Sequence, residues 1–153
     1  MWPAGPYCGL CAPIVCITLA ERLRAHHLLC TALYQGKGYS GEFESNMDRI
    51  ASRICREEDL VLCLLDSPDN ICEECPNLTA EGCRLDDNSV VATDRRLLDL
   101  LGQSAGNCMT VGQCRRLLRR KITSEIFQEL CGECTWKKKG LCSYERLKIQ
   151  LDR

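Results

Sequence analysis

The sequence predicts an α+β fold that is mostly helical, built as one small domain with two cysteine-rich metal-binding loops. The chain has 153 residues, a length typical of one domain, and 45% of them are hydrophobic, which is enough for an ordinary core. Apolar residues recur at helical spacing in several segments. Among the 14 cysteines, six form two copies of the spacing C-x2-C-x7-C.

We divide the chain into an N-terminal extension over residues 1–21 and a cysteine-rich domain over residues 22–153 that binds metal or iron–sulfur. The extension is rich in proline and small residues, and we expect it to be poorly ordered. Its apolar stretch follows no Lys or Arg and is interrupted by cysteines, which suits neither a secretory signal nor a membrane span. We therefore expect a cytoplasmic protein, in which patterned cysteines serve as metal ligands rather than disulfides.

Apolar periodicity and capping residues predict six helices, at residues 22–34, 40–57, 93–101, 110–121, 123–131 and 144–151. Gly36 and Gly38 supply a turn after the first helix, and Ser40 can cap the second. Thr93 or Asp94 can cap the third. We expect one to three short strands beside these helices.

The continuous apolar run over residues 60–65 predicts a buried strand, and the polar segment 66–70 a turn. Cys63 lies inside this run and Cys55 on the apolar side of a predicted helix. We expect both to be small core residues, since free cysteine is among the residues most often buried.

The two repeats supply six candidate ligands, which are Cys72, Cys75, Cys83, Cys131, Cys134 and Cys142. Two thiols separated by two residues can turn toward one metal, and a third thiol one loop later adds another ligand. A duplicated spacing of this kind predicts a metal or cluster site.

Six thiolates are two short of two complete sites, because zinc and iron–sulfur clusters usually take four ligands each. His26 and His27 are the only histidines, and with Cys30 they fall on one side of the predicted first helix. We expect the missing ligands to come from these three residues, with Cys30 first, because a thiolate suits both zinc and iron–sulfur clusters. Core packing is the alternative for the histidines.

Three arrangements satisfy this count. In the first, each repeat holds its own metal and is completed by one residue of the helix. In the second, the two CxxC pairs share one site, and Cys83, Cys142 and the helix residues form another. In the third, one cluster has three cysteine ligands and an open iron. The sequence leaves all three open.

Five segments in chain order carry a family resemblance, at residues 23–30, 36–40, 70–78, 131–136 and 140–142. Together they resemble the bacterial and archaeal domain-of-unknown-function family 1284, over residues 22–144. Members of that family are described as iron–sulfur binding, so the resemblance implies metal binding through these cysteines. The family commonly has two acidic residues before the first motif, where this chain has Asp69 and Asn70.

We predict a cytoplasmic iron–sulfur protein for electron transfer or redox sensing, with one or two clusters of the 4Fe–4S type. Pro76 directly after Cys75 is typical of ferredoxin motifs and agrees with this interpretation. A zinc-stapled structural or interaction module without a redox role is the alternative. An enzyme with Cys30 as nucleophile and His26 or His27 as base comes third.

The formal net charge of −1 gives no reason to expect nucleic acid or an anionic membrane as partner. Basic residues gather at 115–121 and at 137–139. We interpret them first as a solvated helix face near its C-terminus. They would also suit an acidic redox partner protein.

Overall fold

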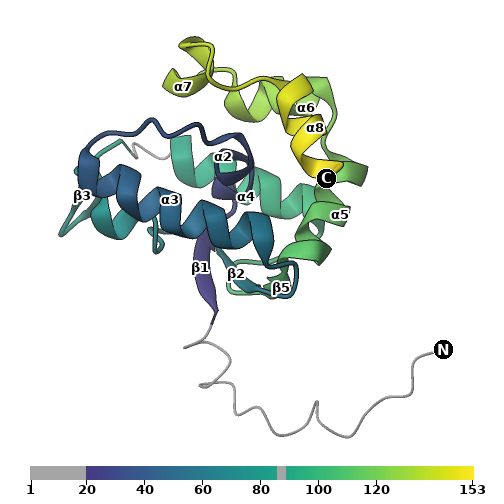
Figure 1. The fold of residues 1–153 in the computed structure, drawn as a ribbon, viewed down its shortest axis with the longest axis horizontal. Coiled ribbons are helices and arrows are strands. Elements are labelled where there is room, and N and C mark those ends of the chain that lie inside the picture. The colour runs from purple at the N-terminus through teal and green to yellow at the C-terminus, as the bar shows by residue number, and fades with distance from the viewer. Residues whose placement is uncertain (1–19, 86–88) are drawn as a thin grey trace, which may run out of the picture.

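The computed structural model describes residues 20–85 and 89–153, so nearly all of the predicted extension lies outside the described residues. The fold is α+β and mostly helical, as predicted (Figure 1). The helices are α2 His27–Leu33, α3 Gly41–Arg56, α4 Ser89–Leu101, α5 Val111–Lys121, α6 Ser124–Cys131, α7 Thr135–Lys138 and α8 Tyr144–Leu151, with a short 3-10 helix η1 at Cys72–Glu74. The strands are β1 Glu21–Arg24, β2 Val61–Leu65, β3 Leu78–Thr79, β4 Gly82–Cys83 and β5 Cys108–Thr110.

Strands β1, β2 and β5 form one sheet in the order β1-β2-β5, parallel between the first two and antiparallel between the last two. Helix α2 follows β1 and packs on α3 and α8. Figure 1 shows α6, α7 and α8, in green to yellow, together on one side of the molecule. The C-terminal cysteine motif is therefore carried by a helical layer that meets the N-terminal part of the chain across α2.

Four predicted helices are confirmed, together with the chemistry of their first turns. The Ser40 side chain accepts a hydrogen bond from the Phe43 backbone N–H at the start of α3. Thr110 and Gln113 form a capping box at α5, and Thr123 caps α6. The strand at residues 60–65 and the last helix are confirmed as β2 and α8.

The predicted first helix is wrong over its N-terminal part. Residues Glu21–Arg24 form β1 instead, and the helix begins only at His27. Leu23 pairs with Leu64 of β2, and both side chains are fully buried. Burial in the sheet outweighs the local helix propensity of this segment.

The predicted third helix begins too late. Helix α4 starts at Ser89, so Asp94 is an internal residue of the helix and not its cap. Asp94 is buried on the same face as Leu97, Leu98 and Leu101. The described residues also contain five strands rather than one to three, because β3, β4 and β5 are too short to be predicted.

Two predictions about the remaining cysteines need correction. Cys63 is buried as predicted, but it forms a disulfide with Cys108, its partner across β2 and β5, with an S–S distance of 2.07 Å. Cys55 is exposed. It directly follows Ile54, the last buried residue of α3, and a step of about 100° takes it off the apolar face.

Within the two described ranges, no helix is both long and apolar enough to cross a bilayer.

Candidate metal centre

Both histidines and all seven cysteines predicted as ligands line one cavity of about 420 Å³. Helix α2 supplies His27 and Cys30, and His26 lies directly before it. The first cysteine loop, residues 72–83, and the second, residues 131–142, supply the six thiols of the repeats. The structure therefore brings all nine predicted residues to one place.

The two CxxC motifs make the same backbone turn. The Cys75 N–H donates to the Cys72 carbonyl at 2.9 Å, and the Cys134 N–H donates to the Cys131 carbonyl at 3.0 Å. A turn of this kind lets two thiols in the motif face one point. The repeated spacing in the sequence is thus a repeated local structure.

The second loop returns its third cysteine through a glycine turn. Cys131 ends α6, and Cys134 precedes α7. Gly140 has a φ of 77°, a left-handed conformation that glycine adopts without strain, and the chain reverses there toward Cys142. All three thiols of this loop are partly buried.

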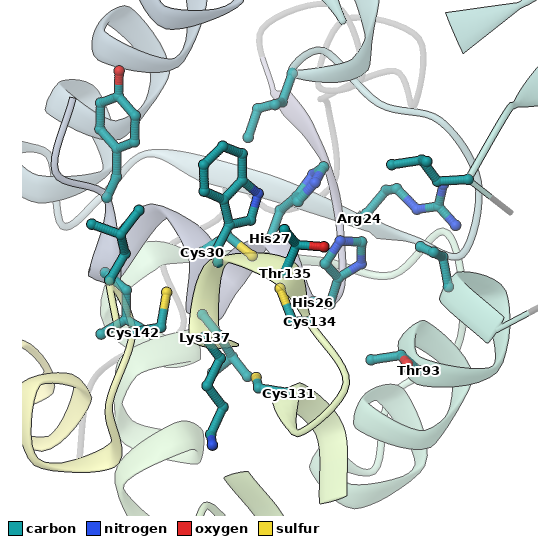
Figure 2. Close-up of a pocket in the computed structure, with 18 of the residues that line it drawn as sticks. Arg24, His26, His27, Cys30, Thr93, Cys131, Cys134, Thr135, Lys137 and Cys142 are labelled. Carbon is teal, nitrogen blue, oxygen red and sulfur yellow. The ribbon is translucent and has the colours of Figure 1, made fainter. Parts of the chain in front are cut away.

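Cys30 joins the three thiols of the second loop. Burial raises the pKa of Cys30 well above its usual range, and the neighbouring Cys131, Cys134 and Cys142 raise it further. Burial also raises the pKa of Cys131 to about 12, with Cys134 and Cys142 acting in the same direction. Figure 2 shows all four cysteines around the cavity. We call Cys30, Cys131, Cys134 and Cys142 the four-cysteine set.

Another group of candidate donors is more compact. In the part of the chain that the structure describes, one group of three candidate donors has its atoms within 4.8 Å of one another, and that group is His27, Asp69 and Cys72. No three of the seven predicted thiols lie so close together. We call His27, Asp69 and Cys72 the compact set.

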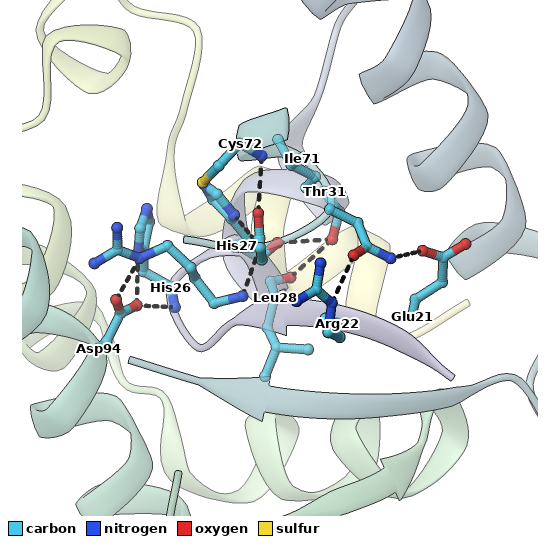
Figure 3. Close-up of polar contacts among 12 residues, drawn as sticks. Glu21, Arg22, His26, His27, Leu28, Thr31, Ile71, Cys72 and Asp94 are labelled. Atoms are coloured by element: carbon cyan, nitrogen blue, oxygen red, sulfur yellow. Dashed lines mark hydrogen bonds and ion pairs between the residues drawn. The ribbon is translucent and has the colours of Figure 1, made fainter. Parts of the chain in front are cut away.

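One buried carboxylate holds the compact set together. Asp69 Oδ2 lies 2.7 Å from His27 Nδ1 and accepts the Arg24 backbone N–H at 2.6 Å. Asp69 Oδ1 accepts the Cys72 backbone N–H at 3.0 Å. Figure 3 shows the hydrogen bonds of His27 and Cys72.

Charge and burial oppose each other at Asp69. Burial raises the pKa of Asp69, but the charge of His27 and hydrogen bonds from His27, Arg24 and Cys72 outweigh it, so the pKa lies well below its usual range. Burial and then the charge of Asp69 raise the pKa of Cys72 to about 12. Asp69 is thus a carboxylate beside a protonated thiol.

The other cysteines of the first loop follow Cys72 through a turn and a hairpin. Cys75 lies directly after η1, and β3 pairs with β4 so that Cys83 is opposite Leu78. Both thiols are partly buried and line the same cavity. The hairpin therefore brings Cys83 back to the cavity that Cys72 and Cys75 also line.

His26 has a carboxylate partner of its own. Its Nδ1 lies 2.6 Å from Asp94 Oδ1, which also accepts the His26 backbone N–H at 2.9 Å (Figure 3). Asp94 Oδ2 accepts a hydrogen bond from Arg24 Nε at 2.7 Å. Burial and the charge of His27 lower the pKa of His26, against the opposing effect of Asp94.

Two residues of this site, Asp69 and Asp94, were not among the ligands predicted from the sequence. Asp94 was interpreted as a cap, although its spacing from Leu97, Leu98 and Leu101 places it on the apolar face of its helix. Asp69 was placed in a plain turn. A carboxylate on an apolar helix face is a signal that could have identified Asp94, because such a group needs a partner when it is buried.

The thiols of Cys30, Cys72 and Cys131 carry protons in the metal-free protein. Raised pKa values at Cys30, Cys72 and Cys131 are the reverse of what activates a nucleophilic cysteine. A metal ion would supply the positive charge that a thiolate needs here, because coordination deprotonates a thiol. The donor set therefore fits metal ligation better than nucleophilic catalysis.

Comparison with known proteins gives a family and no activity. A family model described as "Protein of unknown function (DUF1284)" matches residues 38–140, more than half of the 153 residues. The match contains five repeat cysteines, begins after Cys30 and ends before Cys142. No curated protein and no solved structure matches the chain. The chain belongs to this family of proteins of unknown function, DUF1284.

Proposed function

We propose that the protein binds an iron–sulfur cluster, of the 4Fe–4S type, through the four-cysteine set and uses it for electron transfer or redox sensing. The observation that carries the proposal is the addition of Cys30 to the second motif in one cavity. Four thiolates are the usual complement of such a cluster. Among the three arrangements that the sequence left open, this agrees with a repeat completed by one helix residue.

Positive charge beside the set supports a redox role. Lys137 lines the cavity and opposes the rise in the pKa of Cys131, and Arg146 does the same for Cys142. Positive charge near an anionic cluster makes reduction easier. We infer that the exposed Lys138 and Lys139 could receive an acidic redox partner, as long-range attraction accelerates such encounters.

Zinc is the second candidate, because four thiolates also complete a structural zinc site. Anaerobic purification followed by iron, acid-labile sulfide and zinc analysis separates the two. We expect about four iron and four sulfide per chain at the four-cysteine set, lost on Cys134→Ser. The exposed Cys55 provides the matched control, since Cys55→Ser should leave the metal content unchanged. Stoichiometric zinc without sulfide would reverse the ranking.

A further inference from the structure

The cavity contains a second group of donors besides the four-cysteine set. The four-cysteine set is made of thiols alone, whereas the compact set has one imidazole, one carboxylate and one thiol within 4.8 Å. The imidazole of His27 and the thiol of Cys72 are both donors that zinc binds, with bonds of about 2.0 to 2.3 Å.

Asp69 is the orienting group of the compact set and not one of its ligands. Its Oδ2 has two lone pairs, and the Arg24 backbone N–H at 2.6 Å and His27 Nδ1 at 2.7 Å use both of them. With Nδ1 turned to the carboxylate, the nitrogen of His27 that remains for a metal is Nε2. A carboxylate behind a metal-binding imidazole is the usual device for fixing its tautomer and ring orientation.

The same carboxylate also positions the first cysteine of the repeat. Asp69 Oδ1 accepts the Cys72 backbone N–H at 3.0 Å, so one fully buried side chain fixes both His27 and Cys72. The imidazole itself is 14% exposed. It lines the cavity together with Cys75 and Cys83.

We propose that His27, Cys72, Cys75 and Cys83 form a second, separate site for a single zinc ion, with Asp69 as the residue that positions His27. Three cysteines and one histidine are a common structural zinc set, and imidazole with thiolate is a combination that zinc prefers. His27 and Cys72 already lie close together, and the first loop supplies the other two thiols, with Cys75 directly after η1 and Cys83 in β4.

His26 shows why a carboxylate partner alone does not assign a ligand. It lies beside His27, with a ring-to-ring distance of 4.3 Å, and its Nδ1 faces Asp94 just as that of His27 faces Asp69. However, no described thiol forms a compact set with His26. The proximity of Cys72 is what distinguishes His27.

The test uses the full chain carrying Cys134→Ser, in which the four-cysteine set is incomplete. The result therefore does not depend on whether the proposed cluster binds to that set. Metal-free protein is titrated with Co²⁺, a spectroscopic substitute for zinc, and then with Zn²⁺. We expect one equivalent of tetrahedral cobalt with thiolate-to-cobalt charge transfer, displaced by one equivalent of zinc. Absence of a tetrahedral thiolate spectrum would overturn the proposal.

Variants in the same background assign the roles. His27→Ala and Cys72→Ser should remove the stoichiometric site, whereas Asp69→Asn should keep one equivalent and weaken binding about 10- to 100-fold. Asp66→Asn, in the same turn and paired with Arg95, is the control and should bind as the parent does. Circular dichroism checks that each variant folds, and Cys83→Ser provides a second ligand variant.

Two results would overturn the assignment. Complete loss of metal in a folded Asp69→Asn variant would make Asp69 a ligand rather than a positioning residue. Unchanged affinity in a folded His27→Ala variant would remove His27 from the site.

Discussion

Arg24 Nε donates to Asp94 Oδ2 at 2.7 Å, and the two side chains are only 1% and 0% exposed. Arg24 ends β1 and Asp94 lies inside α4, so this buried ion pair joins the sheet to a helix. The second oxygen of Asp94 holds His26 at the cavity. The ion pair that forms one wall of the candidate metal centre therefore also links the sheet to α4.

Replacement of Asp94 by Ala should destabilise the metal-free protein by about 3 to 5 kcal/mol, because it leaves the charge of Arg24 buried without this partner. The measurement is urea unfolding followed by circular dichroism. Glu129→Ala is the control. It removes the ion pair between Glu129 of α6 and Arg96 of α4, the helix that contains Asp94, and both side chains of this pair are about half exposed. It should change stability little. Equal effects of the two variants would contradict the structural role of Asp94.

Stability should fall in acid. Burial raises the pKa of Asp94, but hydrogen bonds and charges from His26 and Arg24 lower it overall, below its value in the unfolded chain. The charged Asp94 carboxylate therefore stabilises the fold at pH values above about 3.9, the pKa of Asp in an unfolded chain. This stabilisation is lost as the pH falls below that value and Asp94 becomes protonated. Unfolding curves of the metal-free protein across the acid range should show this loss. Asp94→Asn should show a shallower dependence on pH.

Removal of metal should loosen the second loop. No residue from 131 to 142 is fully buried, so burial contributes little to its order. If metal binds there, its binding free energy adds directly to the stability of the loop. Hydrogen exchange with and without a chelator should show faster exchange in this loop and little change in α3. Identical exchange in both states would argue against metal-dependent order.

Loss of the disulfide between Cys63 and Cys108 should weaken the fold without changing the metal content. Cys108→Ser opens a covalent loop spanning 45 residues of sequence, and we expect a loss of about 2 to 4 kcal/mol. Denaturation and metal analysis on the same sample test both parts. Metal loss in this variant would show that the disulfide supports the centre as well as the sheet.

Local chemistry explains which elements could be predicted. Ser40, Thr110 and Thr123 each bond a backbone N–H three residues ahead, a contact that the sequence contains in full. The two CxxC turns are also local, because each is closed by a hydrogen bond between the backbones of its own two cysteines. The boundaries of the capped helices α3, α5 and α6 were predicted to within one residue.

The rest depends on residues that are far apart in the chain. β1 exists because Glu21 pairs with Leu62, and no pattern within residues 21–24 indicates that partner. Asp94 reaches Arg24 across 70 residues of sequence. Similarly, periodicity placed His27 and Cys30 on one helix face but could not show which residues each of them would meet. In the folded chain His27 lies beside Asp69 and Cys72, and Cys30 near the thiols of the second loop.

The origin of Cys30 and Cys142 near opposite ends of the described chain determines the order in which the protein can mature. During synthesis the N-terminal part emerges first. The residues from His27 to Cys83 are all exposed to the cell while the second half is still being made. The four-cysteine set is incomplete until Cys142 has left the ribosome. A cluster bound by this set would therefore have to be delivered after Cys142 emerges, whereas an ion bound by the first loop could be delivered earlier.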